Sequence, residues 1–217
     1  HITDAVMDWI ETVAHQCSDD SGLEPEVCII ELGGTVGDIE SAPYVEALRQ
    51  FQFRVGRDNV TFVHVSLVRV MGPVGEQKTK PTQHTVKELM GLGITPDILV
   101  CRSSAPLNPE TRAKLAAFCH VPQEAVISTH DVPNIYHVPL MLEAQGLCAT
   151  LGLKVQPNGL LDDWRRMAHH LDALQENVTI AMVGKYTDLS DAYLSVIKAL
   201  QHAAMAADRK LTIDWLE

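Results

Sequence analysis

The regular alternation of short apolar runs with amphipathic stretches constrains the fold of this chain most. Apolar runs rich in β-branched residues predict strands over 27–32, 60–70, 97–102 and 125–128. Helical patterns lie between them, one over 43–55 and one that begins at Asn108, because asparagine suits the N-cap and the following proline suits the first turn. Strands that alternate with helices pair in parallel through right-handed crossovers. We therefore expect an α/β fold with a parallel sheet and helices on both faces.

The pattern changes near residue 153. Residues 154–177 contain a proline and a glycine near their start and continue as a charged helix, so we interpret them as a linker followed by a helix. A new strand is predicted over 178–184, followed by a helix over 190–208 and a strand over 211–215. We therefore expect one domain over 1–153, without its N-terminal part, and the truncated start of a second domain over 178–217.

Charge and cysteine content narrow the classes of function. The net charge of −11 argues against binding to nucleic acid or to an anionic membrane. The apolar runs are short and no signal peptide is visible, so no membrane span is predicted. The odd number of cysteines and the lack of CxxC spacing argue against a disulfide framework or a zinc site. They predict a cytoplasmic protein whose cysteines pack in the core, namely Cys17, Cys28, Cys101, Cys119 and Cys148.

Residues 31–41, ELGGTVGDIES, combine acidic residues with a glycine-rich turn. Glu31 ends the apolar run of 27–30, and Asp38 and Glu40 follow the glycines. The carboxyl end of a parallel strand opens onto the ligand crevice, and a carboxylate there can hold Mg²⁺. Glycine allows positive φ and close approach of a ligand to the backbone. An ordinary strand-to-turn junction with surface acids explains this stretch equally well when it is taken alone.

Residues 78–84, KTKPTQH, form a basic segment ahead of a helix predicted to begin near Thr85. Lys78 and Lys80 supply positive charge at a helix N-terminus, which itself favours anions. Lysine is well suited to phosphate. A solvated basic loop is the alternative. Together with the acidic turn, the segment suggests a magnesium–nucleotide site, and we expect the two to converge at the carboxyl edge of the sheet.

These two segments resemble the CTP synthase family, specifically its synthetase (amidoligase) domain. The resemblance extends from His1 to the VGKYTDLSDAY segment and covers the middle of the family's full chain. It implies a P-loop-type, dethiobiotin-synthetase-like amidoligase domain followed by the first β-α-β unit of a class I glutaminase domain. It also implies ATP-dependent amination of UTP to CTP with ammonia derived from glutamine, carried out by a cytoplasmic homotetramer. Glutamine and GTP are then expected to bind to the glutaminase part that is missing from this sequence.

The resemblance assigns ligands to individual residues. It implies that Glu31 binds Mg²⁺ and that product CTP contacts Asp38, Ile39 and Glu40. It implies that UTP and CTP share a second set of contacts, formed by Lys78, Thr79, Lys80, Pro81, Thr82, Gln83 and Lys114. From the residues alone, Lys114 has the pattern of a solvated lysine on a helix face.

The resemblance also implies that ATP, as co-substrate, contacts His130, Asp131 and Val132 through its adenine. From the residues alone, this stretch is a strand-to-loop turn before Pro133. The pair His169–His170 falls in the predicted linker helix, where we interpret both as surface residues and not as metal ligands.

Some features of the family's full chain are not found in this sequence. No GxxxxGK[ST] motif occurs, and no cysteine lies in a nucleophile turn that would predict a glutaminase triad. Arg69 stands where we expect the family to carry proline. We therefore expect the segment to be inactive alone. The alternatives are a non-catalytic UTP/CTP-binding oligomerisation module and another amidoligase of the dethiobiotin or cobyric acid synthase type, which the lysine segment disfavours.

Overall fold

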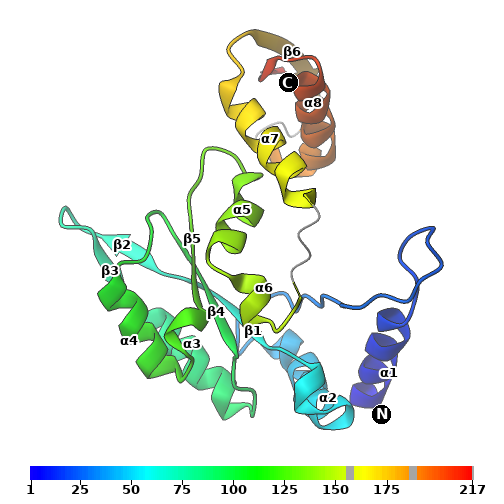
Figure 1. The fold of residues 1–217 in the computed structure, drawn as a ribbon, viewed down its shortest axis with the longest axis vertical. Coiled ribbons are helices and arrows are strands. Elements are labelled where there is room, and N and C mark those ends of the chain that lie inside the picture. The colour runs from blue at the N-terminus through cyan, green and yellow to red at the C-terminus, as the bar shows by residue number, and fades with distance from the viewer. Residues whose placement is uncertain (155–158, 186–189, 217) are drawn as a thin grey trace. The chain divides into compact units, whose positions relative to one another are not determined.

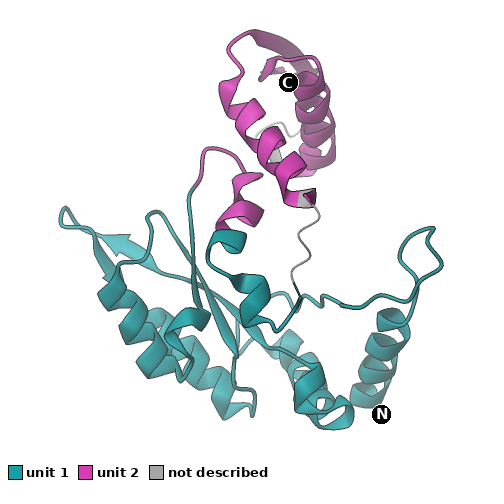
Figure 2. Ribbon diagram, viewed as in Figure 1, with its two compact units in different colours: residues 1–131, 142–155 teal, residues 132–141, 156–217 magenta. Residues whose placement is uncertain are grey.

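The computed structural model describes residues 1–154, 159–185 and 190–216. The chain divides into two compact units, shown in different colours in Figure 2. Unit 1 comprises His1–Asp131 and Leu142–Val155, and unit 2 comprises Val132–Met141 and Gln156–Glu217. No helix in the described part of the chain is both long and apolar enough to cross a membrane.

A parallel sheet of three strands forms the centre of unit 1. Its order is β1 (Val63–Leu67), β4 (Ile98–Ser103) and β5 (Val126–His130), with β4 paired to both neighbours. The side chains of Leu99 and Ile127 are fully buried, as expected for a parallel sheet whose faces are covered. The predicted α/β fold with a parallel sheet is confirmed.

Helices flank this sheet. Helix α3 (Lys80–Gly91) and helix α4 (Pro109–Cys119) pack side by side on it, and the short helix α6 (Leu147–Thr150) lies on the other side (Figure 1). Val86 and Leu115, from the two long helices, are at most 1% exposed in the same core cluster. The core therefore fixes the position of α3 and α4 relative to the strands.

The start of α4 follows the predicted signal. The Asn108 side chain accepts a hydrogen bond from the Thr111 backbone N–H at 2.7 Å, and Pro109 occupies the first turn. The helix ends at His120, whose left-handed conformation (φ 57°) stops it. Both ends of α4 are thus set by local sequence.

Two further elements, α1 (Ile2–Ala14) and α2 (Ala42–Val55), pack on each other. Met7, Ala47 and Phe51 form a small buried cluster between them. At the rim, the Arg54 guanidinium forms ion pairs with Asp8 at 2.7 Å and Glu11 at 2.8 Å. The helix predicted over 43–55 is confirmed as α2.

The strand predicted over 27–32 is wrong. This stretch has no regular structure, and the Ile29 side chain is 92% exposed. A strand persists only where a neighbouring strand satisfies its backbone groups, and no strand among the described residues pairs with this stretch. An apolar run alone indicates strand propensity, but it does not show whether a neighbouring strand is present to pair with it.

Two other predicted strands change their limits. The run over 60–70 splits into β1 and β2 (Arg69–Met71), and β2 pairs with β3 (Glu76–Lys78) in an antiparallel hairpin. The split falls at Val68, which is fully buried and donates its N–H to the Arg102 carbonyl at 2.7 Å. Likewise, the strand predicted over 125–128 is β5, which begins one residue later and continues to His130.

Unit 2 contains a β-α-β unit, as predicted. Strand β6 (Asn177–Val183) pairs in parallel with β7 (Lys210–Leu216), and α8 (Leu194–Ala206) connects them. The expected linker helix is α7 (Leu160–Ala173). Residues 155–158 of the expected linker and 186–189 of the VGKYTDLSDAY segment lie outside the described residues.

The five cysteines are all free. Cys101 and Cys119 are buried, and burial raises the pKa of their thiols to about 12 and about 11. Core packing is therefore confirmed for these two. It is wrong for Cys28 and Cys148, which are exposed; Cys28 belongs to the stretch that does not pair as a strand.

We expect Asn108→Ala to lower the free energy of unfolding by about 1 kcal/mol, because it removes the side-chain acceptor at the N-cap of α4. Urea unfolding followed by circular dichroism measures the change. Asn108→Asp keeps an acceptor at the same position and should stay close to wild type. Equal stability of the alanine and aspartate variants would contradict the capping role.

We expect His64 to make unit 1 less stable in acid. Its ring is 9% exposed and its Nε2 lies 3.0 Å from the Thr85 hydroxyl, and burial lowers the pKa of His64 below the usual 6.5. Below about pH 6.5 the unfolded chain therefore binds this proton more readily than the folded chain, and the free energy of unfolding falls with pH. Urea unfolding between pH 7.5 and 5 should show that the free energy of unfolding declines less steeply with falling pH in His64→Gln than in wild type. Identical slopes would refute the role of His64 in this acid destabilisation.

Candidate functional site

The basic segment lies at a strand-to-helix junction and not in a loop. Lys78 ends β3, Thr79 is the N-cap, and residues 80–83 form the first turn of α3. The helix start predicted near Thr85 is therefore wrong by about one turn. Pro81 explains the difference, because proline is favoured in the first helical turn, where its missing N–H is not needed.

One side of α3 is fixed to the sheet by hydroxyl groups. The Thr82 side chain is fully buried, and its hydroxyl lies 2.8 Å from that of Ser66 on β1. One turn later, the Thr85 hydroxyl contacts His64, also on β1. These buried polar contacts set the rotation of α3 about its axis, so that the opposite stripe of the helix faces outward.

The outward stripe of α3 lines a cavity of about 660 Å³, a volume typical of small-molecule sites. Its cationic and polar lining comes from α3, and the C-terminal end of α4 supplies a further wall with Phe118 and His120. The α3 residues that line the cavity are Lys80, Pro81, Gln83, His84, Lys87 and Met90. In a chain of net charge −11, this is a local concentration of positive charge.

The expected pyrimidine-nucleotide residues are distributed unequally around this cavity. Lys80, Pro81 and Gln83 line it, and Lys114 is exposed on α4 one turn before Phe118, hence on the same helix face. Lys78 instead pairs with Glu76 at 2.6 Å. The remaining two are turned inward: Thr82 reaches β1, and Thr79 is 4% exposed and accepts a hydrogen bond from Gln83 at 3.0 Å.

The acidic turn is held by its own side chains. The Asp38 carboxylate accepts the Thr35 N–H at 2.9 Å, and the Ser41 hydroxyl donates to the Asp38 carbonyl at 3.0 Å. Residues Ile39–Ser41 then form a short 3₁₀ turn that leads into α2. The Ile39 side chain is 88% exposed, and Glu40 is exposed as well.

Gly37 places this turn against the last part of α3. Its φ is +99°, and a Cβ at this position would lie 3.0 Å from the carboxyl carbon of Glu88. Glu88 follows Lys80 by eight residues, which is about 12 Å along the helix axis. The acidic turn and the basic segment thus both adjoin α3, but the prediction that they converge at the carboxyl edge of the sheet is wrong, because the turn meets the helix eight residues after Lys80.

Glu31 lies outside any cluster of ligands in the described part of the chain. It is exposed within the unpaired stretch that was expected to be a strand. The only described group of three histidine, cysteine or acidic side chains close enough to share a cation lies elsewhere, in unit 2. A single exposed carboxylate is nevertheless compatible with Mg²⁺, which takes one or two carboxylates and completes its shell with phosphate oxygens and water.

The carboxyl edge of the sheet carries two unsatisfied polar atoms. Ser103 and His130 end β4 and β5 and are register partners. The Ser103 hydroxyl and the His130 Nδ1 are buried, and neither has a hydrogen-bond partner among the described residues. Buried polar atoms are nearly always paired, so an unpaired couple at a strand end indicates a ligand site. Asp131 and Val132, the other expected adenine contacts, follow directly.

Sequence reasoning missed Ser103, His84 and Lys87. The rule that ligands bind at the carboxyl ends of parallel strands would have found Ser103, since it ends a buried run. His84 and Lys87 follow from the helical period once α3 is known to begin at Lys80, because they lie on the same stripe of the helix.

Comparison with known proteins identifies the family. A family model described as CTP synthase N-terminus matches residues 1–156. The chain belongs to the CTP synthase family. It is 55% identical to CTP synthase of Eremothecium gossypii, 52% to CTP synthase 1 of Homo sapiens and 51% to CTP synthase of Dictyostelium discoideum. The resemblance inferred from the two motifs is confirmed.

The alignments cover this chain completely but the relatives only in part. They include 100% of the chain and 40%, 38% and 42% of the three relatives, respectively. The chain therefore spans about two fifths of the length of these CTP synthases.

We expect Gly37→Ala to destabilise unit 1 by about 1–2 kcal/mol, the cost of a left-handed backbone for a residue with a Cβ, plus the displacement of Glu88. The measurement is the free energy of unfolding in urea. Gly33→Ala is the matched control, because its φ is not positive and nothing lies within 4 Å of the added Cβ. Adding Glu88→Ala to the Gly37→Ala variant should restore the part of the lost unfolding free energy that crowding against the Glu88 side chain causes. Equal effects at Gly33 and Gly37 would show that the turn does not rest on α3.

Proposed function

We propose that this chain supplies the UTP- and CTP-binding surface of a CTP synthase, and that the α3 cavity is that surface. The observation that carries the proposal is that three residues of the KTKPTQ segment, Lys80, Pro81 and Gln83, line one cavity of suitable size in a chain of this family. The curated relatives are CTP synthases by name, and the product of such an enzyme is a pyrimidine nucleoside triphosphate.

The triphosphate lies at the N-terminal end of α3 in this proposal. Lys80 lines the cavity from the first turn of α3. No side chain caps this turn; Pro81 has no N–H and the Gln83 N–H donates to the Thr79 carbonyl at 3.0 Å, which leaves the N–H groups of Lys80 and Thr82 for an anion. Lys78 joins them by leaving Glu76, an exposed pair that contributes little stability. Lys114 adds a further cation from α4.

The pyrimidine and ribose lie toward the other end of the helix. Phe118 is 60% exposed beside the cavity and offers an aromatic face to a base. The acidic turn with Asp38, Ile39 and Glu40 rests on the same end of α3 through Gly37. Carboxylates there would accept hydrogen bonds from ribose hydroxyls or from a cytosine amino group.

ATP binds at the carboxyl edge of the sheet in this proposal. The Ser103 hydroxyl and the His130 Nδ1, which have no hydrogen-bond partner in the described part of the chain, are hydrogen-bonding positions for the adenine edge, next to Asp131 and Val132. Glu31 holds Mg²⁺ through its carboxylate, and the cation, when bound, offsets the negative charge of the phosphates during transfer. The residues of this chain bind and orient the two nucleotides.

The reaction assigned to the whole protein is the ATP-dependent amination of UTP. ATP phosphorylates the uracil 4-oxygen, ammonia derived from glutamine attacks C4, and phosphate leaves. In this proposal residues 1–153 form a dethiobiotin-synthetase-like amidoligase domain, 154–177 a linker, and 178–217 the start of a glutaminase domain. Glutamine and GTP act through the rest of that second domain, in a cytoplasmic homotetramer.

The alternative is a UTP/CTP-binding assembly module without turnover. Incubation of this chain with UTP, ATP, Mg²⁺ and ammonium chloride separates the two: CTP formation excludes the module, whereas ligand-dependent oligomerisation without CTP supports it.

We expect the double variant Lys78→Ala/Lys80→Ala to weaken UTP and CTP binding at least 10-fold, because each charge-assisted hydrogen bond to phosphate contributes about 1.5–3 kcal/mol. Isothermal titration calorimetry of the 217-residue chain with Mg²⁺ and either nucleotide gives the Kd. Lys210→Ala, a lysine on β7 far along the chain, is the control and should bind like wild type. Unchanged affinity in the double variant would remove the α3 cavity from consideration.

A further inference from the structure

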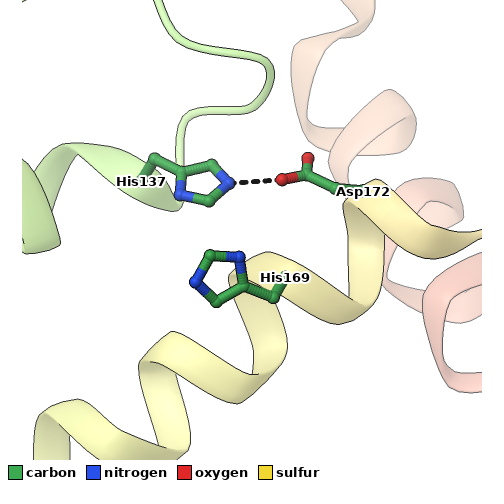
Figure 3. Close-up of side chains that lie close together, drawn as sticks. All are labelled: His137, His169 and Asp172. Atoms are coloured by element: carbon green, nitrogen blue, oxygen red, sulfur yellow. Dashed lines mark hydrogen bonds and ion pairs between the residues drawn. The ribbon is translucent and has the colours of Figure 1, made fainter.

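Two histidines and an aspartate of unit 2, none of them among the residues proposed for the nucleotide sites, lie close together. His137 is the first residue of α5 (His137–Ala144), and His169 and Asp172 project from α7. One ligand atom from each of the three lies within 4.8 Å of the others. Figure 3 shows the two imidazole rings and the carboxylate turned toward one another. His169 and Asp172 are three residues apart and therefore share a face of their helix.

Supporting contacts orient this cluster. The His137 Nε2 lies 2.6 Å from the Asp172 Oδ2, and the Asn134 amide donates to the Asp172 Oδ1 at 2.6 Å and to the Ala168 carbonyl at 3.1 Å. The His137 side chain is only 16% exposed.

A His–Asp hydrogen bond accounts for His137 and Asp172 but not for His169. The His169 ring makes no hydrogen bond to a described residue, yet it packs edge-on to His137 with ring centroids 5.2 Å apart. The expectation that His169 is a surface residue is confirmed, since it is exposed. Its position beside a second imidazole and a carboxylate gives it a further use.

We propose that His137, His169 and Asp172 bind a divalent transition-metal cation, with Zn²⁺ as the best match. Two imidazoles and one carboxylate are ligands that Zn²⁺ accepts, and three protein ligands leave a fourth position for water. In tetrahedral coordination the His137 nitrogen and the Asp172 oxygen would separate to about 3.3 Å. This is a small change from 2.6 Å. Asn134 then acts as the outer partner that holds the carboxylate.

The bound cation would fasten two distant segments of unit 2. His137 and Asp172 are separated by 35 residues in the sequence, and a metal ion that bridges them closes this loop in the folded chain. Because the site needs both segments in place, binding free energy is also folding free energy. Zn²⁺ should therefore raise the thermal stability of unit 2.

The experiment uses the 217-residue chain, freed of metal with EDTA and with its accessible thiols alkylated so that they do not compete for the cation. Zn²⁺ is titrated by calorimetry, and Co²⁺ is added separately because its visible spectrum reports the number and kind of ligands. His169→Gln is the test variant, since the ring that it removes makes no hydrogen bond to a described residue. His170→Gln is the matched control on the same helix, where His170 pairs instead with Asp208 at 2.9 Å.

We expect one Zn²⁺ per chain in wild type and in His170→Gln, with a rise in Tm, and at least 10-fold weaker binding in His169→Gln. A Co²⁺ spectrum of a nitrogen- and oxygen-ligated tetrahedral site should appear in the same two proteins alone. Absence of stoichiometric binding to wild type overturns the proposal. So does equal binding by the His169 and His170 variants, because it would show only scattered adventitious histidine sites.

Discussion

The Gln77 side chain ties together the two helices that form the cavity. Its amide nitrogen donates to the Pro106 carbonyl at 2.8 Å, and its amide oxygen accepts the Asn108 N–H at 3.0 Å. Gln77 lies on β3, three residues before α3, and Asn108 is the N-cap of α4. One side chain therefore links the beginnings of both helices, and this polar link adds to the core contacts of Val86 and Leu115 that hold α3 and α4 on the sheet.

Helix α3 performs two tasks because its two sides have different chemistry. Threonine hydroxyls on one side join the sheet through short polar contacts, which specify a rotation that apolar contacts alone would leave less defined. Lysine, glutamine and histidine side chains on the other side remain outward. A polar side chain also fixes the edge strand β5. The Gln145 amide oxygen accepts the Ser128 N–H and its amide nitrogen donates to the Ser128 carbonyl, both at 2.8 Å, so that the side chain takes the place of a neighbouring strand.

Local sequence signals correctly predicted the elements whose limits depend on neighbouring residues in the sequence. Helix α4 followed from Asn108 and Pro109, and the β6–α8–β7 unit from its periodicity and spacing. The prediction of a strand over 27–32 was wrong, because a strand needs a neighbouring strand to pair with and no local pattern reveals that neighbour. The candidate site could be anticipated only in part. The basic motif indicated Lys80, which lines the α3 cavity, whereas only the family resemblance indicated His130. The approach of His137 to Asp172 is a contact between residues 35 positions apart, which spacing along the chain does not encode.

In the proposed nucleotide site, separation along α3 would allow acidic and basic residues to serve one anionic ligand in a chain of net charge −11. At physiological ionic strength, charges in solvent are largely screened beyond about 8 Å, so the overall charge matters less to a phosphate than the lysines next to it. The acidic turn contacts α3 at Glu88, about 12 Å along the axis from Lys80. Its carboxylates are thus too far away to repel a phosphate at the helix N-terminus strongly, yet they remain on the same helix. A turn placed at Lys80 itself would cancel the attraction that the lysines provide.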